Sequence, residues 1–109
     1  MRLGELVKTA AAEGKEKHVP VIKLVDGGRA VKITVGREVP HPNTVEHHIK
    51  WIMLFGVRGG VAVHIATFDL GPTYGAPEVT AHANLEGFSE LIAVEYCNIH
   101  SLWESSYQL

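Results

Sequence analysis

The sequence predicts an all-β domain, an antiparallel β-sandwich or barrel of about seven short strands with a short N-terminal helix. Apolar and polar residues alternate in several short runs, which is the period of a strand with one buried face. Glycine-rich turn signals such as Asp26-Gly27-Gly28 and Arg58-Gly59-Gly60 separate these runs. Short strands with frequent turns and almost no helix are typical of sandwiches and barrels.

The helix is expected over residues 3–12, where apolar residues recur at helical spacing before Gly14. The charged Glu5 and Lys8 interrupt this segment, so we do not expect a secretory signal. No apolar run approaches the length of a membrane span. These features predict a soluble cytoplasmic protein that does not associate with a membrane.

The strands follow in chain order, each marked by alternating apolar residues, and are expected at 21–25, 30–35, 48–57, 61–68, 79–85 and 91–96. The longest of them, 48–57, directly follows a loop that contains two prolines. Pro72 and Pro77, each beside a glycine or alanine, predict a loop over 69–77.

The composition indicates one folded domain, 1–109, with a single core. Its 46% hydrophobic and 20% charged residues are typical of a globular protein. The formal net charge of -2 and the absence of a Lys/Arg run argue against a nucleic-acid partner. The only cysteine, Cys97, permits no internal disulfide, which fits a reducing compartment.

Two histidines near the middle of the chain are candidate metal ligands. His41 stands between Pro40 and Pro42, so its backbone is restricted to an extended or turn conformation. His47 stands at the entrance of the longest expected strand. A metal site needs donors held in fixed positions, which both locations provide. A rigid loop histidine without a ligand role is the alternative for His41.

A third candidate is the pair Cys97 and His100, which forms a Cys-x-x-His motif. This spacing allows both side chains to bind one ion. The alternative for Cys97 is a small core residue at the end of a strand. Each of these signals is weak alone, and together they predict a metal centre.

The remaining central histidines, His48, His64 and His82, are interpreted as ordinary surface or hydrogen-bonded residues. His48 points away from His47 if the segment is extended, and His82 alternates with polar neighbours. His64 lies opposite the apolar face of its strand, where burial against a neighbour is expected.

Three motifs follow one another along the chain: Glu16-Lys17-His18-Val19-Pro20, then His41-Pro42-Asn43 with His47, then Cys97-Asn98-Ile99-His100. In this order they resemble the motifs of the superoxide reductases, and among them the short neelaredoxin type with one iron centre. The resemblance covers about residues 15–104. It implies an immunoglobulin-like β-sandwich and a one-electron reduction of superoxide to hydrogen peroxide, an oxidoreductase activity that protects against oxidative stress.

The resemblance also implies the site residues and partners. The iron would be mononuclear and non-haem, with His18, His41, His47 and His100 as equatorial ligands and Cys97 as the axial ligand. Glu16 and Lys17 would lie on a mobile loop over the open sixth position. Glu16 could close the ferric site, and Lys17 could attract superoxide. A rubredoxin-like protein would donate electrons, and the protein would form a homotetramer.

The last motif departs from the family at Ser101, where the family usually has glycine after the final ligand histidine. A loop that needs positive φ at this position would be strained by serine. With Cys97 as the only cysteine, the second, cysteine-rich iron domain of the long family members is not expected.

Two other functions compete with this interpretation. A blue-copper electron carrier is also a β-sandwich with Cys and His ligands, but it often adds an axial methionine, and neither Met1 nor Met53 follows His100. A zinc-stapled structural module would usually have four ligands and a closed site, whereas this chain offers five candidates.

Overall fold

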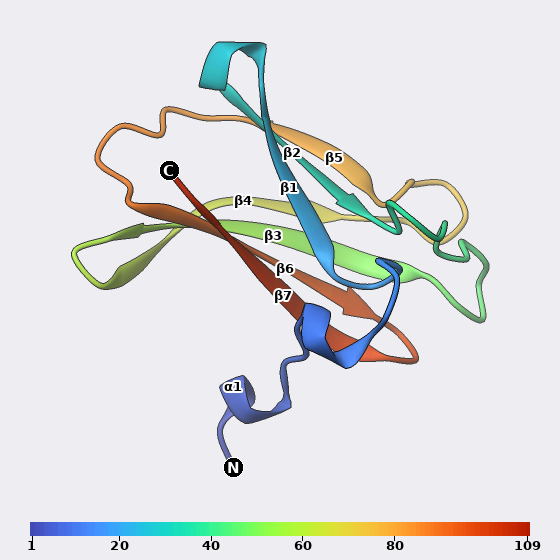
Figure 1. Cartoon of the computed structure of the whole chain (residues 1–109). Coiled ribbons are helices and arrows are strands. Elements are labelled where there is room, and N and C mark those ends of the chain that lie inside the picture. Colours follow the sequence, from blue (N-terminus) through green and yellow to red (C-terminus); the bar gives the residue numbers. More distant parts are fainter.

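The computed structural model describes all of residues 1–109 and confirms the antiparallel β-sandwich (Figure 1). One sheet has the order β1-β2-β5, and the other has the order β4-β3-β6-β7. The strands are β1 (Pro20–Val25), β2 (Ala30–Val35), β3 (Ile49–Arg58), β4 (Val61–Asp69), β5 (Glu78–His82), β6 (Glu90–Cys97) and β7 (Ser101–Gln108).

The core forms between the two sheets because each strand alternates buried and half-buried residues. In β6 the buried positions are Leu91, Ala93, Glu95 and Cys97, while the residues between them face outward. The facing sheet contributes β-branched residues of β2, such as Ile33, which is fully buried. β-branched side chains pack well on a pleated surface, which explains their use here. Cys97 therefore belongs to a rigid, buried face.

The N-terminal helix is shorter than the sequence predicted. Helix α1 spans Leu3–Leu6 and buries no residue, and a separate 3-10 turn spans Ala10–Ala12. Between them Lys8 is extended, because its backbone bonds to Leu102 and Glu104 at the edge of β7. Edge pairing thus prevails over helical spacing in this segment. None of the helices is both long and apolar enough to span a membrane.

The ladder of β3 with β6 brings distant parts of the chain to one end of the sandwich, at right in Figure 1. Ile49 at the start of β3 pairs with Cys97 at the end of β6. In the other sheet, Pro20 at the start of β1 pairs with Val35 at the end of β2. The segments that precede β1 and β3, or follow β2 and β6, consequently meet at this end.

Glu95 is an unexpected member of the core. It is fully buried, and neither carboxyl oxygen has a hydrogen-bond partner. Burial raises the pKa of Glu95 to about 9, with a smaller contribution from the charge of Glu13. The carboxyl group is therefore neutral near pH 7 and adds no negative charge beside Cys97.

Candidate metal centre

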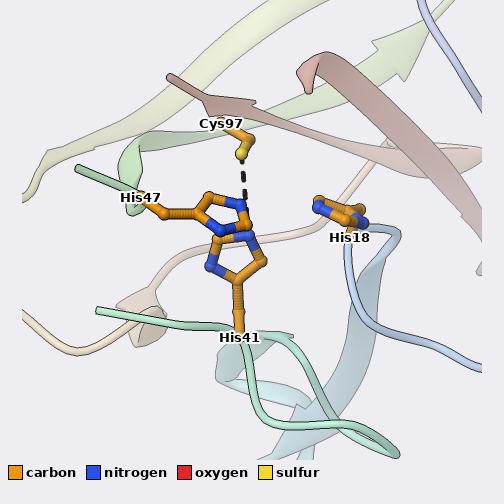
Figure 2. Close-up of side chains that lie close together, drawn as sticks. All are labelled: His18, His41, His47 and Cys97. Atoms are coloured by element: carbon orange, nitrogen blue, oxygen red, sulfur yellow. Dashed lines mark hydrogen bonds between the residues drawn. The ribbon is translucent and has the colours of Figure 1, made fainter. Parts of the chain in front are cut away.

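Four side chains that the sequence predicted as ligands converge at this end of the sandwich. One donor atom from each of His18, His41, His47 and Cys97 lies within 4.8 Å of all the others. Figure 2 shows the rings of His41 and His47 below the Cys97 sulfur, with His18 beside them. His41 Nε2 lies 3.6 Å from Cys97 Sγ.

His41 is oriented by the loop on which the prolines place it. Its Nδ1–H donates a 2.7 Å hydrogen bond to the carbonyl of Pro42, which leaves the Nε2 lone pair directed at the cluster. Burial lowers the pKa of His41 to about 4, more than the Pro42 carbonyl raises it. The ring is therefore neutral at physiological pH and available as a ligand.

His18 is oriented by Glu13, a residue that the sequence reasoning missed. The Glu13 carboxylate accepts the His18 Nδ1–H at 3.1 Å and also the backbone N–H groups of Lys17, His18 and Val19. Burial raises the pKa of Glu13, but these hydrogen bonds together lower it more, so the net pKa is below its ordinary value. A carboxylate behind a ligand imidazole is a common outer-shell partner in metal sites.

His47 carries the clearest sign of a missing partner. Its Nε2 atom is buried and makes no hydrogen bond. Burial also lowers the pKa of His47, so the ring is neutral and Nε2 can present a lone pair. Because a buried polar atom without a partner is costly, a metal ion in the cluster would remove this penalty.

The turn between β6 and β7 holds Cys97 and His100 together. The backbone N–H of His100 donates to Cys97 Sγ at 3.4 Å, which closes the turn. His100 Nδ1 lies 3.8 Å from that sulfur and 3.1 Å from His18 Nε2. His100 therefore adjoins the four-donor cluster, although it is not a member of the group whose donors are all mutually close.

Trp103 supports both neighbouring histidines and was also missed from the sequence. Its ring stacks on His18, with centroids 4.9 Å apart and an interplanar angle of 15°. Its Nε1–H donates to the His100 carbonyl at 3.1 Å. The Lys8 ammonium bonds to the same carbonyl, at 3.1 Å. Trp103 is three residues beyond His100, but nothing in the sequence distinguishes it from an ordinary core tryptophan.

The four donors fit a metal ion, and their chemistry limits which one. Three neutral imidazoles and a thiol are nitrogen and sulfur ligands, which suit iron, copper or zinc rather than magnesium or calcium. Two of the rings have their outer N–H groups satisfied, at Pro42 and Glu13, so their Nε2 atoms carry the lone pairs, which face the neighbouring donors Cys97 Sγ and His100 Nδ1.

Glu16 and Lys17, the predicted catalytic residues, lie beside the cluster and outside it. Glu16 forms an ion pair with Arg37, and its backbone bonds to the loop before His41. Lys17 lines a surface depression of about 450 Å³, whose walls also include His18, His100 and Trp103. The mobility predicted for this loop stays a prediction.

The other three central histidines are separate from the cluster. His48 is buried and its Nδ1–H donates to the Thr44 carbonyl at 3.0 Å, as expected of a hydrogen-bonded residue. His82 is exposed, also as expected. Burial of His64 was a wrong expectation, because this residue is exposed and bonds to Thr67 at the outer surface of β4.

Comparison with known proteins identifies the family. The desulfoferrodoxin family model matches residues 10–106. The chain belongs to the desulfoferrodoxin family. A superoxide reductase from Pyrococcus horikoshii is 39% identical, with 98% of each chain covered. The neelaredoxin of Megalodesulfovibrio gigas is 34% identical over 97% of this chain and 95% of its own.

A solved structure agrees with this membership. The superoxide reductase from Giardia intestinalis aligns with a TM-score of 0.80 and 40% identity, covering 87% of this chain and 100% of its own. The resemblance to the superoxide reductases of the neelaredoxin type is thus confirmed, as is the expected enzyme class, an oxidoreductase.

The backbone at Gly36 generates a first prediction. Gly36 has φ 88°, and a Cβ there would lie 2.6 Å from the backbone nitrogen of His41. Gly36→Ala should displace His41 and lower the affinity for ferrous iron by about tenfold or more, as outer-shell changes do. Gly28→Ala is the matched control, because Gly28 has φ 84° with open space around it. Iron titration of both purified variants is the measurement, and equal affinities would contradict a positioning role for Gly36.

Ser101 generates a second prediction. Its φ is 67°, so the turn does require the left-handed conformation in which serine is strained. Because Ser101 is exposed, Ser101→Gly should increase the free energy of unfolding by about 0.5–1 kcal/mol. Ser106→Gly, at an exposed strand position of β7, should decrease it. Thermal unfolding of the two variants checks this, and a loss of stability in Ser101→Gly would refute the strain.

Proposed function

We propose that the protein is a superoxide reductase that reduces superoxide to hydrogen peroxide with one electron from an external donor. The observation that carries this proposal is the cluster of three neutral imidazoles and one thiol, in which His47 Nε2 has no partner. Membership of the desulfoferrodoxin family supports the reaction. The overall reaction takes one superoxide, one electron and two protons to one hydrogen peroxide.

The proposed cofactor is a mononuclear non-haem iron bound by His18, His41, His47, His100 and Cys97. Iron supplies the one-electron couple between its ferrous and ferric forms. His100 adjoins the four-donor cluster, and the position of its Nδ1 atom, 3.1 Å from His18 Nε2 and 3.8 Å from Cys97 Sγ, favours its inclusion as the fifth ligand. Five donors of this kind suit iron with one coordination position left for a substrate.

The two alternative metal sites have less support. A blue-copper site with axial methionine is disfavoured because Met53 lies between the buried residues Ile52 and Leu54, on the outer face of β3. Met1 is almost fully exposed. A structural zinc site is closed and has four ligands, which the four-donor cluster would already supply. The fifth donor beside this cluster, His100, therefore disfavours structural zinc.

The residues around the cluster would orient the ligands, attract the substrate and close the ferric site. Glu13 and the Pro42 carbonyl accept the outer N–H groups of His18 and His41 and so orient both rings, while burial lowers the pKa of each ring and keeps it neutral. The His100 N–H donates to Cys97 Sγ and would hold the sulfur in position. Lys17 would attract the anionic substrate into the adjoining depression. Glu16 would be the group able to close the ferric site.

The proposal extends to partners and location. We infer a rubredoxin-like electron donor, a homotetrameric assembly and a cytoplasmic location, each from the family resemblance. Assignment of the whole chain, 1–109, to one iron-binding domain is part of the same proposal, and the family match over 10–106 supports it.

Electron stoichiometry tests the proposed reaction. With iron bound, the protein should consume about one donor electron for each superoxide removed, and Cys97→Ser should lose most of this activity and the visible thiolate-to-iron band. His82→Ala, at an exposed position outside the cluster, should retain both. Superoxide removal that continues at the same rate without reductant would make the protein a dismutase.

A salt series tests the role of Lys17. A cation beside the site should accelerate entry of a small anion by about tenfold, and salt should screen this effect over roughly 10 Å at 0.1 M. Lys17→Ala should therefore slow the second-order reaction of the ferrous protein with superoxide and flatten its ionic-strength dependence, with iron content unchanged. Pulse radiolysis provides the rates. Lys23→Ala, on an exposed position of β1, is the control, and identical salt slopes for both variants would contradict steering by Lys17.

A further inference from the structure

The loop that carries His18 and the loop that leads to His41 are joined at Glu16. The Glu16 carbonyl accepts the backbone N–H groups of Glu38 and Val39, at 3.1 and 3.0 Å. The Glu16 N–H donates to the Glu38 carboxylate at 3.1 Å. Three hydrogen bonds thus fix the backbone of Glu16, and its side chain is the part left to move.

The Glu16 side chain is held by Arg37 alone. Arg37 Nε donates to one carboxylate oxygen at 2.7 Å, and Arg37 Nη2 donates to the other at 2.9 Å. This two-point geometry is the strongest that a guanidinium and a carboxylate can adopt. Both Glu16 oxygens are therefore occupied, and neither belongs to the four-donor cluster.

We propose that Arg37 is a positioning residue that holds the Glu16 carboxylate away from the metal and so keeps the site open to exogenous anions. The proposal rests on the proposed function, in which Glu16 can close the ferric site. A Glu16 oxygen that binds the metal is no longer available to Arg37, so closing the site would break the two-point contact.

Arg37 lies on the same loop as the candidate ligand His41. It follows Gly36, whose α-carbon packs against the backbone of His41, so the guanidinium and a ligand share one short loop. The ion pair is also partly exposed, with 58% of the Arg37 side chain and 25% of the Glu16 side chain accessible. An exposed pair contributes modestly, so the balance between the two arrangements can be reversed by a single competing ligand.

Azide titration of the ferric protein, followed by its visible spectrum, tests the proposal. In Arg37→Gln the released Glu16 carboxylate should compete with azide and raise the apparent Kd about three- to tenfold. Arg37→Lys, which cannot make the two-point contact, should give an intermediate value. Glu16→Gln should bind azide more tightly than the unmodified protein, and adding Arg37→Gln to it should have no further effect.

A control is available in Arg29, which forms a more exposed ion pair with Asp26 at 3.0 Å in the turn between β1 and β2. Arg29→Gln should leave azide affinity unchanged. In the iron-free protein, the Arg37 Nε proton should be protected in NMR spectra, and Glu16→Gln should abolish that protection.

The outcomes separate the two proposals. If Glu16→Gln tightens azide binding and Arg37→Gln has the same affinity as the unmodified protein, the role of Arg37 is overturned and the proposed function stands. If Glu16→Gln has no effect, Glu16 does not close the site and the Arg37 proposal fails with it. A protein that binds no iron would overturn the proposed function itself.

Discussion

The close approach of buried, neutral imidazoles to a thiol is the constraint on which the rest of the site depends. Protonation of any one ring would place a charge beside the other rings in a poorly solvated space, and burial accordingly lowers the pKa values of His18, His41 and His47. A neutral ring has one N–H to satisfy and one lone pair to use. Glu13 and Pro42 accept two of these N–H groups, so the Nε2 lone pair of His41 faces the Cys97 sulfur and that of His18 faces His100.

That constraint explains why the surrounding backbone takes costly conformations. Gly36 turns the chain in the left-handed region so that His41 can approach it at contact distance. Ser101 adopts the same left-handed conformation at the start of β7, immediately after His100. Strain of this kind persists where the neighbouring structure holds it, and here the β6–β7 ladder and the bond from Trp103 to His100 do so.

Much of the fold and of the donor set could be predicted from the sequence because both depend on local signals. Strand alternation identified six strands, and the prolines around His41 indicated a histidine held in a fixed position, which the structure places in the four-donor cluster. β7 was not recognised, since Trp103 is its only buried residue and its outer positions are polar, as an edge strand permits. The helix over 3–12 was overestimated because the edge pairing of Lys8 with β7 is a tertiary contact.

The supporting residues could not be predicted for a related reason. Glu13 acts on His18 through a turn of the chain that collects three backbone N–H groups, and no spacing rule encodes such a turn. Arg37 acts on Glu16 from 21 residues away in the sequence. The contacts of Glu13 and Arg37 form only where two loops meet, whereas the candidate ligands are recognisable from their residue types alone.

These hidden contacts change the electrostatics of the site. The segment from Glu13 to Lys17 looks balanced in sequence, with two acids and two lysines. In the folded protein the Glu13 carboxylate binds His18 and backbone donors, and the Glu16 carboxylate binds Arg37. Neither Lys15 nor Lys17 takes part in an ion pair, and both line the depression beside His18 and His100. A chain with a net charge of -2 can therefore present a cationic entrance to a small anion, because its local acids are already occupied.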